Sequence, residues 1–287
     1  MASLKEIKTR ILSIQSTEKV TSAMRMVASA KLHKAEMIIE GMLPFQNQLD
    51  RIAGNFLQGD TMIDSPYLEQ REVKRVAVVA FSSNSALCGA FNSNVIKKTV
   101  EVIEGYEKLG RENVLIYTVG RKVEKAVRKL GYEVAGSYAS LSEKPTYEGA
   151  LQLANVLKDL FVKKEVDQVD LVYYHFKTSG SQVLVQDTYL PLTFEQKAKE
   201  SEFADEYIVE PSGTELMNRL IPTVLNQKMF TAAMDSNTSE HAVRMIAMQV
   251  ATDNANQLIQ ELKLQYNKVR QQAITNELLD IVGGSAR

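Results

Sequence analysis

Apolar or small residues recur at alternating steps of three and four along both ends of the chain. The N-terminal stripe consists of Leu4, Ile7, Ile11, Ile14, Thr21, Ala28, Leu32, Ala35, Ile39, Met42, Leu49, Ala53 and Phe56. The C-terminal stripe consists of Met245, Met248, Thr252, Ala255, Ile259, Leu262, Tyr266, Val269 and Ala273. Steps averaging about 3.5 residues keep one seam of a helix facing a partner helix. The pattern predicts two long helices that pair as an antiparallel coiled coil.

The ends of these helices carry sequence signals of their own. The first helix is expected over residues 3–57, with a bend near Pro44, and would be ~80 Å long. The second is expected from Pro211, with Ser212 and Glu215 as a capping box, to about residue 281, and would be ~105 Å long. Pro222 predicts a local kink, and the pair Gly283-Gly284 predicts the stop.

Between the helices the period changes, and buried strands alternate with helices. Strands are expected at 74–81, 113–119, 133–138, 170–177 and 181–190, and helices at 92–109, 121–130 and 147–164. The last two strands form a hairpin around Ser179-Gly180. Alternation of this kind predicts an α/β fold, here a Rossmann-like globular domain of about five strands. The expected division is 1–57 for the first coiled-coil helix, 73–192 for the globular domain and 210–287 for the second helix.

Charge is uneven along the chain, although the 287 residues sum to a net charge of −1. Residues 1–34 hold seven basic groups against two acids, which gives +5, and residues 194–215 hold seven acids against two lysines, which gives −5. The neutral balance argues against a nucleic-acid partner, whereas the basic helix favours an acidic protein partner or is an ordinary solvated face. No apolar run approaches the ~20 residues that span a bilayer. The basic start is interpreted as mature protein and not as a presequence, because Glu6 and the uninterrupted helical pattern are unusual for one.

Catalytic chemistry has little support in the sequence. The loop 82–94 after the first strand is the natural place for a site in such a sheet, but the chain has neither GxGxxG nor GxxxxGK[ST]. Cys88 is the single cysteine, and it is interpreted as a small packed hydrophobe because His33, His175 and His241 belong to other elements. No spacing indicates a metal site. We therefore expect no catalytic residue, no cofactor and no metal.

Polar residues interrupt the coiled-coil seam. Glu18 and Arg25 stand where an ideal seam has leucine, and Arg270 and Gln271 are expected around the same level of the other helix. Polar seam residues set the register of a coiled coil or contact a further partner, and the pattern leaves both readings open.

Specific sequence motifs occur at both ends of the chain. The first helix carries KEIKTRI (5–11) and TEKVTSAMRMVASAKL (17–32). The last helix carries SEHAVRMIAM (239–248), ATDNANQLI (251–259) and YNKVRQQAITNELLDIVGG (266–284), and the middle adds LCGAFN (87–92). Together these motifs resemble the γ subunit of F-type ATP synthases of the bacterial type. One departure is that Asn84-Ser85-Ala86 stands where the family usually has Asp-Arg before the Gly-Leu-Cys-Gly turn.

The resemblance implies a rotor shaft at the cytoplasmic face of the bacterial cell membrane, a peripheral and non-catalytic subunit. Its implied partners are the α and β subunits of the catalytic head, the ε subunit and the membrane rotor ring, with no nucleic acid and no direct nucleotide binding. The residues implied to contact β are Met24, Arg25, Arg244, Arg270, Gln271 and Thr275. The residues implied to contact the foot or a neighbouring subunit are Asn84, Ser85 and Tyr207. The tip of the last helix beyond Ala273 has no partner helix and is expected to be the softest part.

Two alternatives remain from the residues alone. A coiled-coil scaffold or adaptor without a rotary role explains the heptads but not the specific end motifs. An α/β enzyme with helical arms for oligomerisation lacks a cofactor motif.

Overall fold

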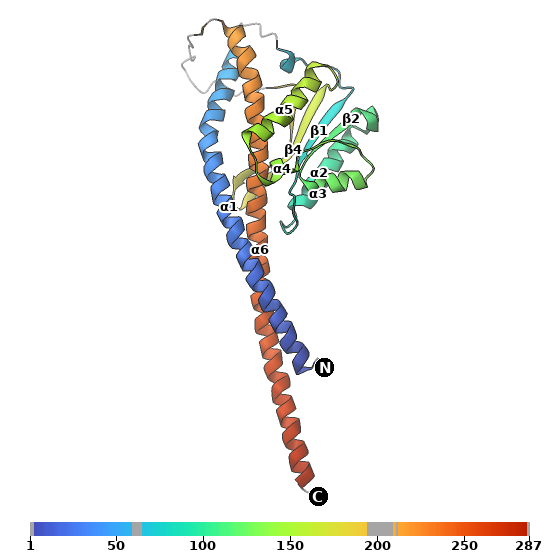
Figure 1. Cartoon of the computed structure of the whole chain (residues 1–287), viewed down its shortest axis with the longest axis vertical. Helices are drawn as coiled ribbons and strands as arrows, with labels where there is room; N and C mark the ends of the chain where they lie inside the picture. The colour runs from blue at the N-terminus through green and yellow to red at the C-terminus, as the bar shows by residue number, and fades with distance from the viewer. Residues whose placement is uncertain (1–2, 59–64, 194–208, 211, 286–287) are drawn as a thin grey trace. The chain divides into compact units, whose positions relative to one another are not determined.

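The structure is a computed structural model that describes residues 3–58, 65–193, 209–210 and 212–285 (Figure 1). Two compact units make up the chain. One unit comprises Met1–Ala30 with Arg244–Arg287, and the other comprises Lys31–Val243. The helices α1 (Leu4–Gln58) and α6 (Gly213–Ser285) each contribute to both units.

The unit Lys31–Val243 contains one five-stranded sheet with the strand order β3-β2-β1-β4-β5. Its strands are β1 (Val76–Phe81), β2 (Val114–Val119), β3 (Val134–Ser137), β4 (Gln168–Thr178) and β5 (Ser181–Leu190). The strands β1 to β4 run parallel, with Val76 of β1 opposite Val114 of β2 and Gln168 of β4. The strand β5 runs antiparallel to β4. All six residues of β1 are buried, which is the pattern of a central parallel strand covered on both faces.

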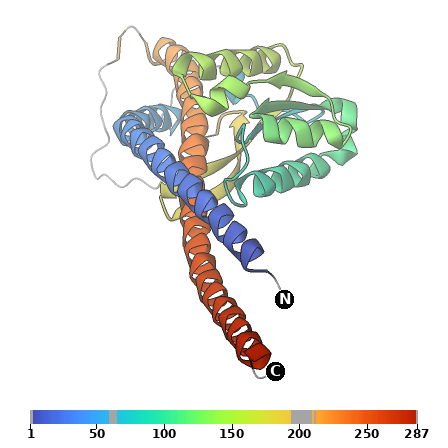
Figure 2. The same cartoon turned by 60° about the horizontal axis from the view of Figure 1, so that its bottom comes forward.

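Helices cover both faces of this sheet (Figure 2). On one face, α2 (Phe91–Gly105) and α3 (Arg121–Lys129) pack Val102 and Val123 against Val78 of β1. The opposite face is covered by α5 (Tyr147–Val162) and by the first part of α6. A short helix, α4 (Ala139–Glu143), connects β3 to α5.

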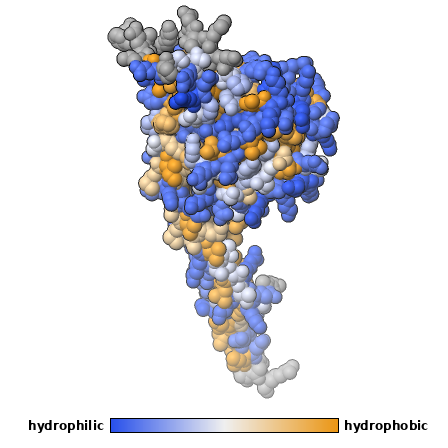
Figure 3. Space-filling model, turned by 45° about the horizontal axis from the view of Figure 1, so that its top comes forward, coloured by the Kyte–Doolittle hydropathy of each residue, from blue (hydrophilic) through white to orange (hydrophobic). Residues whose placement is uncertain are grey.

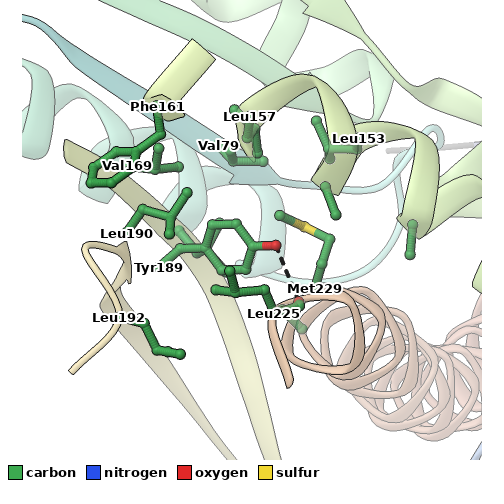
Figure 4. Close-up of a cluster of buried hydrophobic side chains, with 14 of the residues drawn as sticks. Val79, Leu153, Leu157, Phe161, Val169, Tyr189, Leu190, Leu192, Leu225 and Met229 are labelled. Atoms are coloured by element: carbon green, nitrogen blue, oxygen red, sulfur yellow. Dashed lines mark hydrogen bonds between the residues drawn. The ribbon is translucent and has the colours of Figure 1, made fainter. Parts of the chain in front are cut away.

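The larger core lies between β1, α5 and α6 (Figure 4). Leu157 and Phe161 of α5 are fully buried, as is Leu225 of α6. The hydroxyl of Tyr189 on β5 donates a hydrogen bond to the carbonyl oxygen of Leu225 at 3.1 Å. Burial of a large side chain is worth ~1.5–3 kcal/mol, so this core holds α6 firmly on the sheet.

The unit Met1–Ala30 with Arg244–Arg287 is a pair of antiparallel helices, and the start of α1 and the end of α6 lie toward the same end of it (Figure 1). The buried stripe contains Ile7, Thr21 and Ala28 on α1, and Met248, Thr252, Ala255, Ile259 and Leu262 on α6. The Oγ1 atoms of Thr21 and Thr252 share a hydrogen bond of 2.8 Å across the seam. The predicted apolar stripe and the antiparallel coiled coil are therefore confirmed.

The strands and helices expected from the sequence are present, with shifted ends. The strand β4 begins at Gln168, two residues before the expected position, and α4 had no sequence prediction. The capping interaction of Ser212 exists, because its Oγ accepts a hydrogen bond from the N–H of Glu215 at 3.3 Å. The predicted stop at Gly283-Gly284 is wrong, since α6 continues to Ser285. Glycine costs a helix only ~1 kcal/mol, and it ends one only where the backbone turns left-handed.

Candidate subunit-contact surfaces

Met24 and Arg25 lie half-buried on α1, beside α6. The Nε atom of Arg25 is buried and has no hydrogen-bond partner within the described part of the chain. Arg244, at the boundary of the same unit, is only 9% exposed. A buried guanidinium donor is costly when it lacks a partner, so the Nε of Arg25 is an unsatisfied donor beneath the helix surface.

The register of the two helices corrects one expectation about these residues. Thr21 lies opposite Thr252, so antiparallel pairing brings Arg25 to the level of Met248. Arg270 lies 22 residues farther along α6 than Met248, which is ~33 Å at 1.5 Å per residue. The expectation that Arg25 and Arg270 share a level is therefore wrong. Heptad spacing fixes the face of each helix and not its axial offset.

Arg270, Gln271 and Thr275 form a separate exposed group on α6. The same register places residue 269 opposite Leu4, where α1 begins, so α6 continues beyond this level without α1 beside it. The hydroxyl of Thr275 donates to the carbonyl oxygen of Gln271 at 2.9 Å, a bond within the helix.

The end of α6 also exposes large apolar side chains, which the sequence analysis did not single out. These residues are Ile274, Leu278, Leu279, Ile281 and Val282, and each is between 48% and 67% exposed. Figure 3 shows apolar side chains along this part of the surface. We call these five residues the apolar tip. Their i, i+4 spacing at positions 274, 278 and 282 was the available signal, and such a patch marks an interaction site.

In the other unit, Asn84 follows β1 and is an internal bridge. Its Nδ2 donates to the carbonyl oxygen of Ala139 at 2.8 Å, and its Oδ1 accepts from the N–H of Arg121 at 3.0 Å. Ser85 is exposed, and its carbonyl oxygen accepts from the Oγ of Ser83 and the Nδ2 of Asn92. Ser85 is therefore the more exposed of the two residues, whereas Asn84 is half-buried and its side chain holds Ala139 and Arg121.

At the carboxyl edge of the sheet, where α/β proteins bind phosphates, backbone N–H groups donate hydrogen bonds to side chains of the protein itself. Asn92 Oδ1 accepts from the N–H of Ser83 at 3.0 Å, and Ser82 Oγ accepts from the N–H of Val123 at 3.0 Å. Gly120 adopts φ +109°, and a Cβ there would stand 2.1 Å from the carbonyl oxygen of Ser82. The chain packs against itself where a phosphate cradle would need space.

Cys88 is buried against Phe91, Val95 and Tyr174, and Asn92 Nδ2 donates to its sulfur at 3.1 Å. The prediction of a packed cysteine is therefore confirmed. No cluster of His, Cys, Asp and Glu that could hold a metal occurs in the described ranges. Among the helices of residues 3–58, 65–193 and 212–285, none is long and apolar enough to cross a membrane. Tyr207 lies outside the described residues.

Comparison with known proteins identifies the family. The family model described as ATP synthase matches residues 3–286. The ATP synthase gamma chain of Bacteroides thetaiotaomicron is 58% identical and covers 99% of both chains. The ATP synthase gamma chains of Phocaeicola vulgatus and Flavobacterium johnsoniae are 53% and 41% identical over 99% of this chain, and the matches span 99% and 98% of those proteins.

Solved structures have the same fold. A chain of the mitochondrial ATP synthase of Euglena gracilis aligns with a TM-score of 0.64 and 18% identity, over 99% of this chain and 93% of that one. A chain of the central stalk and c-ring of the Tetrahymena thermophila mitochondrial ATP synthase gives a TM-score of 0.59 at 20% identity, over 81% of this chain and 99% of that one. With a family model that matches nearly its whole length and relatives of up to 58% identity, the chain belongs to the ATP synthase family and is similar to its gamma chains.

Proposed function

We propose that this chain is the central rotor shaft of an F-type ATP synthase, a subunit that couples ion flow through the membrane rotor ring to conformational change in the catalytic β subunits. The observation that carries the proposal is 58% identity to an ATP synthase gamma chain over 99% of both chains. In this proposal the helices of residues 1–57 and 210–287 form the shaft, and residues 73–192 form the globular foot.

The physical requirement for coupling is an asymmetric contact. A shaft biases a β subunit only if it contacts the two conformations of that subunit differently. A single antiparallel helix pair presents a different face to each of three surrounding β subunits. The half-buried Arg25, the exposed Arg270 and the apolar tip supply charge and apolar area for such contacts.

The proposed partners are the α and β subunits, the ε subunit and the rotor ring. Met24, Arg25 and Arg244 contact the head at one level, and Arg270, Gln271 and Thr275 contact it at another, ~33 Å along the helix from Arg25. Ser85 and Tyr207 contact neighbouring subunits near the foot, and Asn84 acts by holding the loop of Ser85 in place. The subunit lies peripherally at the cytoplasmic face of the membrane.

In this proposal the chain has no catalytic role of its own, and ATP chemistry belongs to the β subunits. Two features support it. Asparagine and serine side chains accept the hydrogen bonds of backbone N–H groups at the carboxyl edge of the sheet. Most of the motif residues that resemble the family lie in the two end helices, and only LCGAFN (87–92) lies at that edge.

The test is reconstitution of the full chain with the α and β subunits of its own synthase. We expect one copy to assemble with three copies each of α and β, and ATP hydrolysis to drive its rotation. The variant Arg270→Gln is expected to lower the torque while the helix content by circular dichroism stays unchanged, because Arg270 is exposed in the free chain. The exposed Lys263→Gln on the same helix is the matched control. A chain that forms a homodimer and binds neither α nor β contradicts the proposal.

A further inference from the structure

A stretch of α6 is buried on all sides although it is polar. Eleven successive residues, Ala232–Ala242, are buried, which is about three helical turns. Asp235–His241 (DSNTSEH) within it has no apolar residue, and we call it the buried polar segment. Helices buried all round are normally apolar, because polar groups lose water on burial. Buried hydrogen bonds are directional, whereas apolar packing is not, so a buried polar helix is held in one orientation more specifically than an apolar helix.

Side-chain or backbone groups of four different elements anchor this segment and the turns before it. From α5, Lys158 Nζ donates to Asn226 Oδ1 at 2.7 Å. On the β5 side, Lys228 Nζ lies 3.0 Å from Asp187 Oδ2 and donates to the carbonyl oxygen of Thr188 at 3.1 Å. From β4, His175 Nδ1 lies 2.6 Å from Asp235 Oδ2. From α4, the carbonyl oxygen of Ser142 accepts from Asn237 Nδ2 at 2.8 Å.

The four anchors, which are the contacts of Asn226, Lys228, Asp235 and Asn237, lie on two opposite sides of α6. Asn226 and Asn237 are eleven residues apart, about three full turns, so they share one side of the helix. Lys228 and Asp235 are seven residues apart, about two turns, so they also share a side. Asn226 and Asp235 are nine residues apart, about 2.5 turns, which sets the two sides opposite each other. Rotation of α6 about its own axis would strain bonds on both sides at once.

The packing around the anchors leaves little unoccupied volume. The cavity beside the segment, lined by Phe81, Ser142, Asn237 and Glu240 among others, measures about 10 Å³. That volume holds at most one water molecule. A rotation of the helix in its seat would therefore also need the apolar core to repack.

We propose that these anchors fix the rotational register of α6 in the sheet domain, so that torque passes between the domain and the helix without slip. The inference rests on the proposed rotor function. It assigns to Lys158, Lys228, Asp235 and Asn237 a positioning role in that function, separate from any contact with another subunit. The lysines and Asp235 are retained for stiffness about the helix axis and not for stability.

Stiffness and stability can be separated by replacing whole pairs with apolar residues. Substitution of both partners of a buried polar pair is often neutral or stabilising, whereas removal of one partner leaves the other unsatisfied. The test variant carries Lys158→Met with Asn226→Leu and Asp235→Leu with His175→Phe. The control removes an exposed ion pair on the same helix, Arg219→Met with Glu215→Leu.

The measurement uses the full chain assembled with the α and β subunits, the head fixed to a surface, and a gold particle on a cysteine introduced at the exposed Lys108. The angular variance of the particle during a catalytic dwell reports stiffness. If the four anchors act as independent parallel springs, removal of two raises the variance about twofold. The control pair leaves the variance unchanged, and unfolding in urea verifies that the variant is folded.

Unchanged variance in a folded, assembled variant overturns the inference. If the four-substitution variant does not assemble, the angular variance is measured on the single variant Lys228→Met instead. The Lys228 side chain is 24% exposed, so its replacement disturbs the core less. That variant is expected to raise the variance by about one third, because it removes one of four anchors. If the unsubstituted chain fails to assemble or rotate, the proposed function itself is refuted, and this inference falls with it.

Discussion

The carboxyl of Asp235 provides a quantitative test of how the buried polar segment is held. Burial raises its pKa to about 6 from the ordinary 3.8, although the hydrogen bond and charge of His175 and the N–H of Phe176 act in the opposite direction. A group whose pKa rises on folding binds its proton more tightly in the folded state. Its contribution to stability is complete below the unfolded pKa and is lost as the pH rises through the folded pKa.

The size of this effect follows from the shift. A rise of about 2.2 pKa units, at 1.36 kcal/mol per unit, gives ~3 kcal/mol. The variant Asp235→Asn has nearly the same shape and cannot ionise. The free energy of unfolding of this variant, minus that of the unsubstituted chain, is therefore expected to increase by ~3 kcal/mol between about pH 3 and about pH 7.

The assay is urea unfolding of both chains across this pH range, followed by the near-ultraviolet circular dichroism of tyrosine. Titrating groups that do not interact with Asp235 cancel in the difference between the two chains. Asp253→Asn, an exposed aspartate on the same helix, serves as the matched control. A difference that stays constant with pH would show that folding leaves the pKa of Asp235 unchanged, and a difference that decreases as the pH rises would show that the carboxylate is stabilised as an anion; either result refutes the reasoning.

Two further substitutions test the packing of the sheet domain. Gly120→Ala is expected to destabilise the fold by more than ~3 kcal/mol, because φ is +109° and the new Cβ would stand 2.1 Å from the carbonyl oxygen of Ser82; an unchanged midpoint of thermal unfolding would contradict this. Tyr189→Phe is expected to cost ~1 kcal/mol, since it removes the 3.1 Å hydrogen bond to Leu225 and keeps the ring. A loss in urea unfolding as large as that of Tyr189→Ala would show instead that the ring position depends on the hydroxyl.

The helical periodicity of the sequence predicted some features of the candidate contact residues and not others. The periodicity identified which face of each end helix is buried, and the motifs at both ends pointed to the correct family before any geometry was known. The same pattern could not place Arg25 relative to Arg270, because a one-heptad slide preserves every apolar contact type. The cross-seam pair of Thr21 and Thr252 decides the offset.

Asn84 and the buried polar segment illustrate a second limit. From the sequence, Asn84 is expected to contact a neighbouring subunit, and no local signal marks DSNTSEH as a segment buried on all sides. Both form hydrogen bonds with residues distant in the chain, such as Ala139 for Asn84 and His175 for Asp235. A polar side chain carries no local signal that a distant donor or acceptor will satisfy it.

The sequence alone determined the properties that depend on neighbours within one or two turns: the seam of the helices, the order of strands and helices, and the packed character of Cys88. The tertiary structure decided the axial register of α1 and α6, the bridge made by Asn84 and the enclosure of Asp235. The physical reason is that side-chain periodicity is fixed by backbone geometry along a single element, whereas register and polar pairing depend on which distant groups meet.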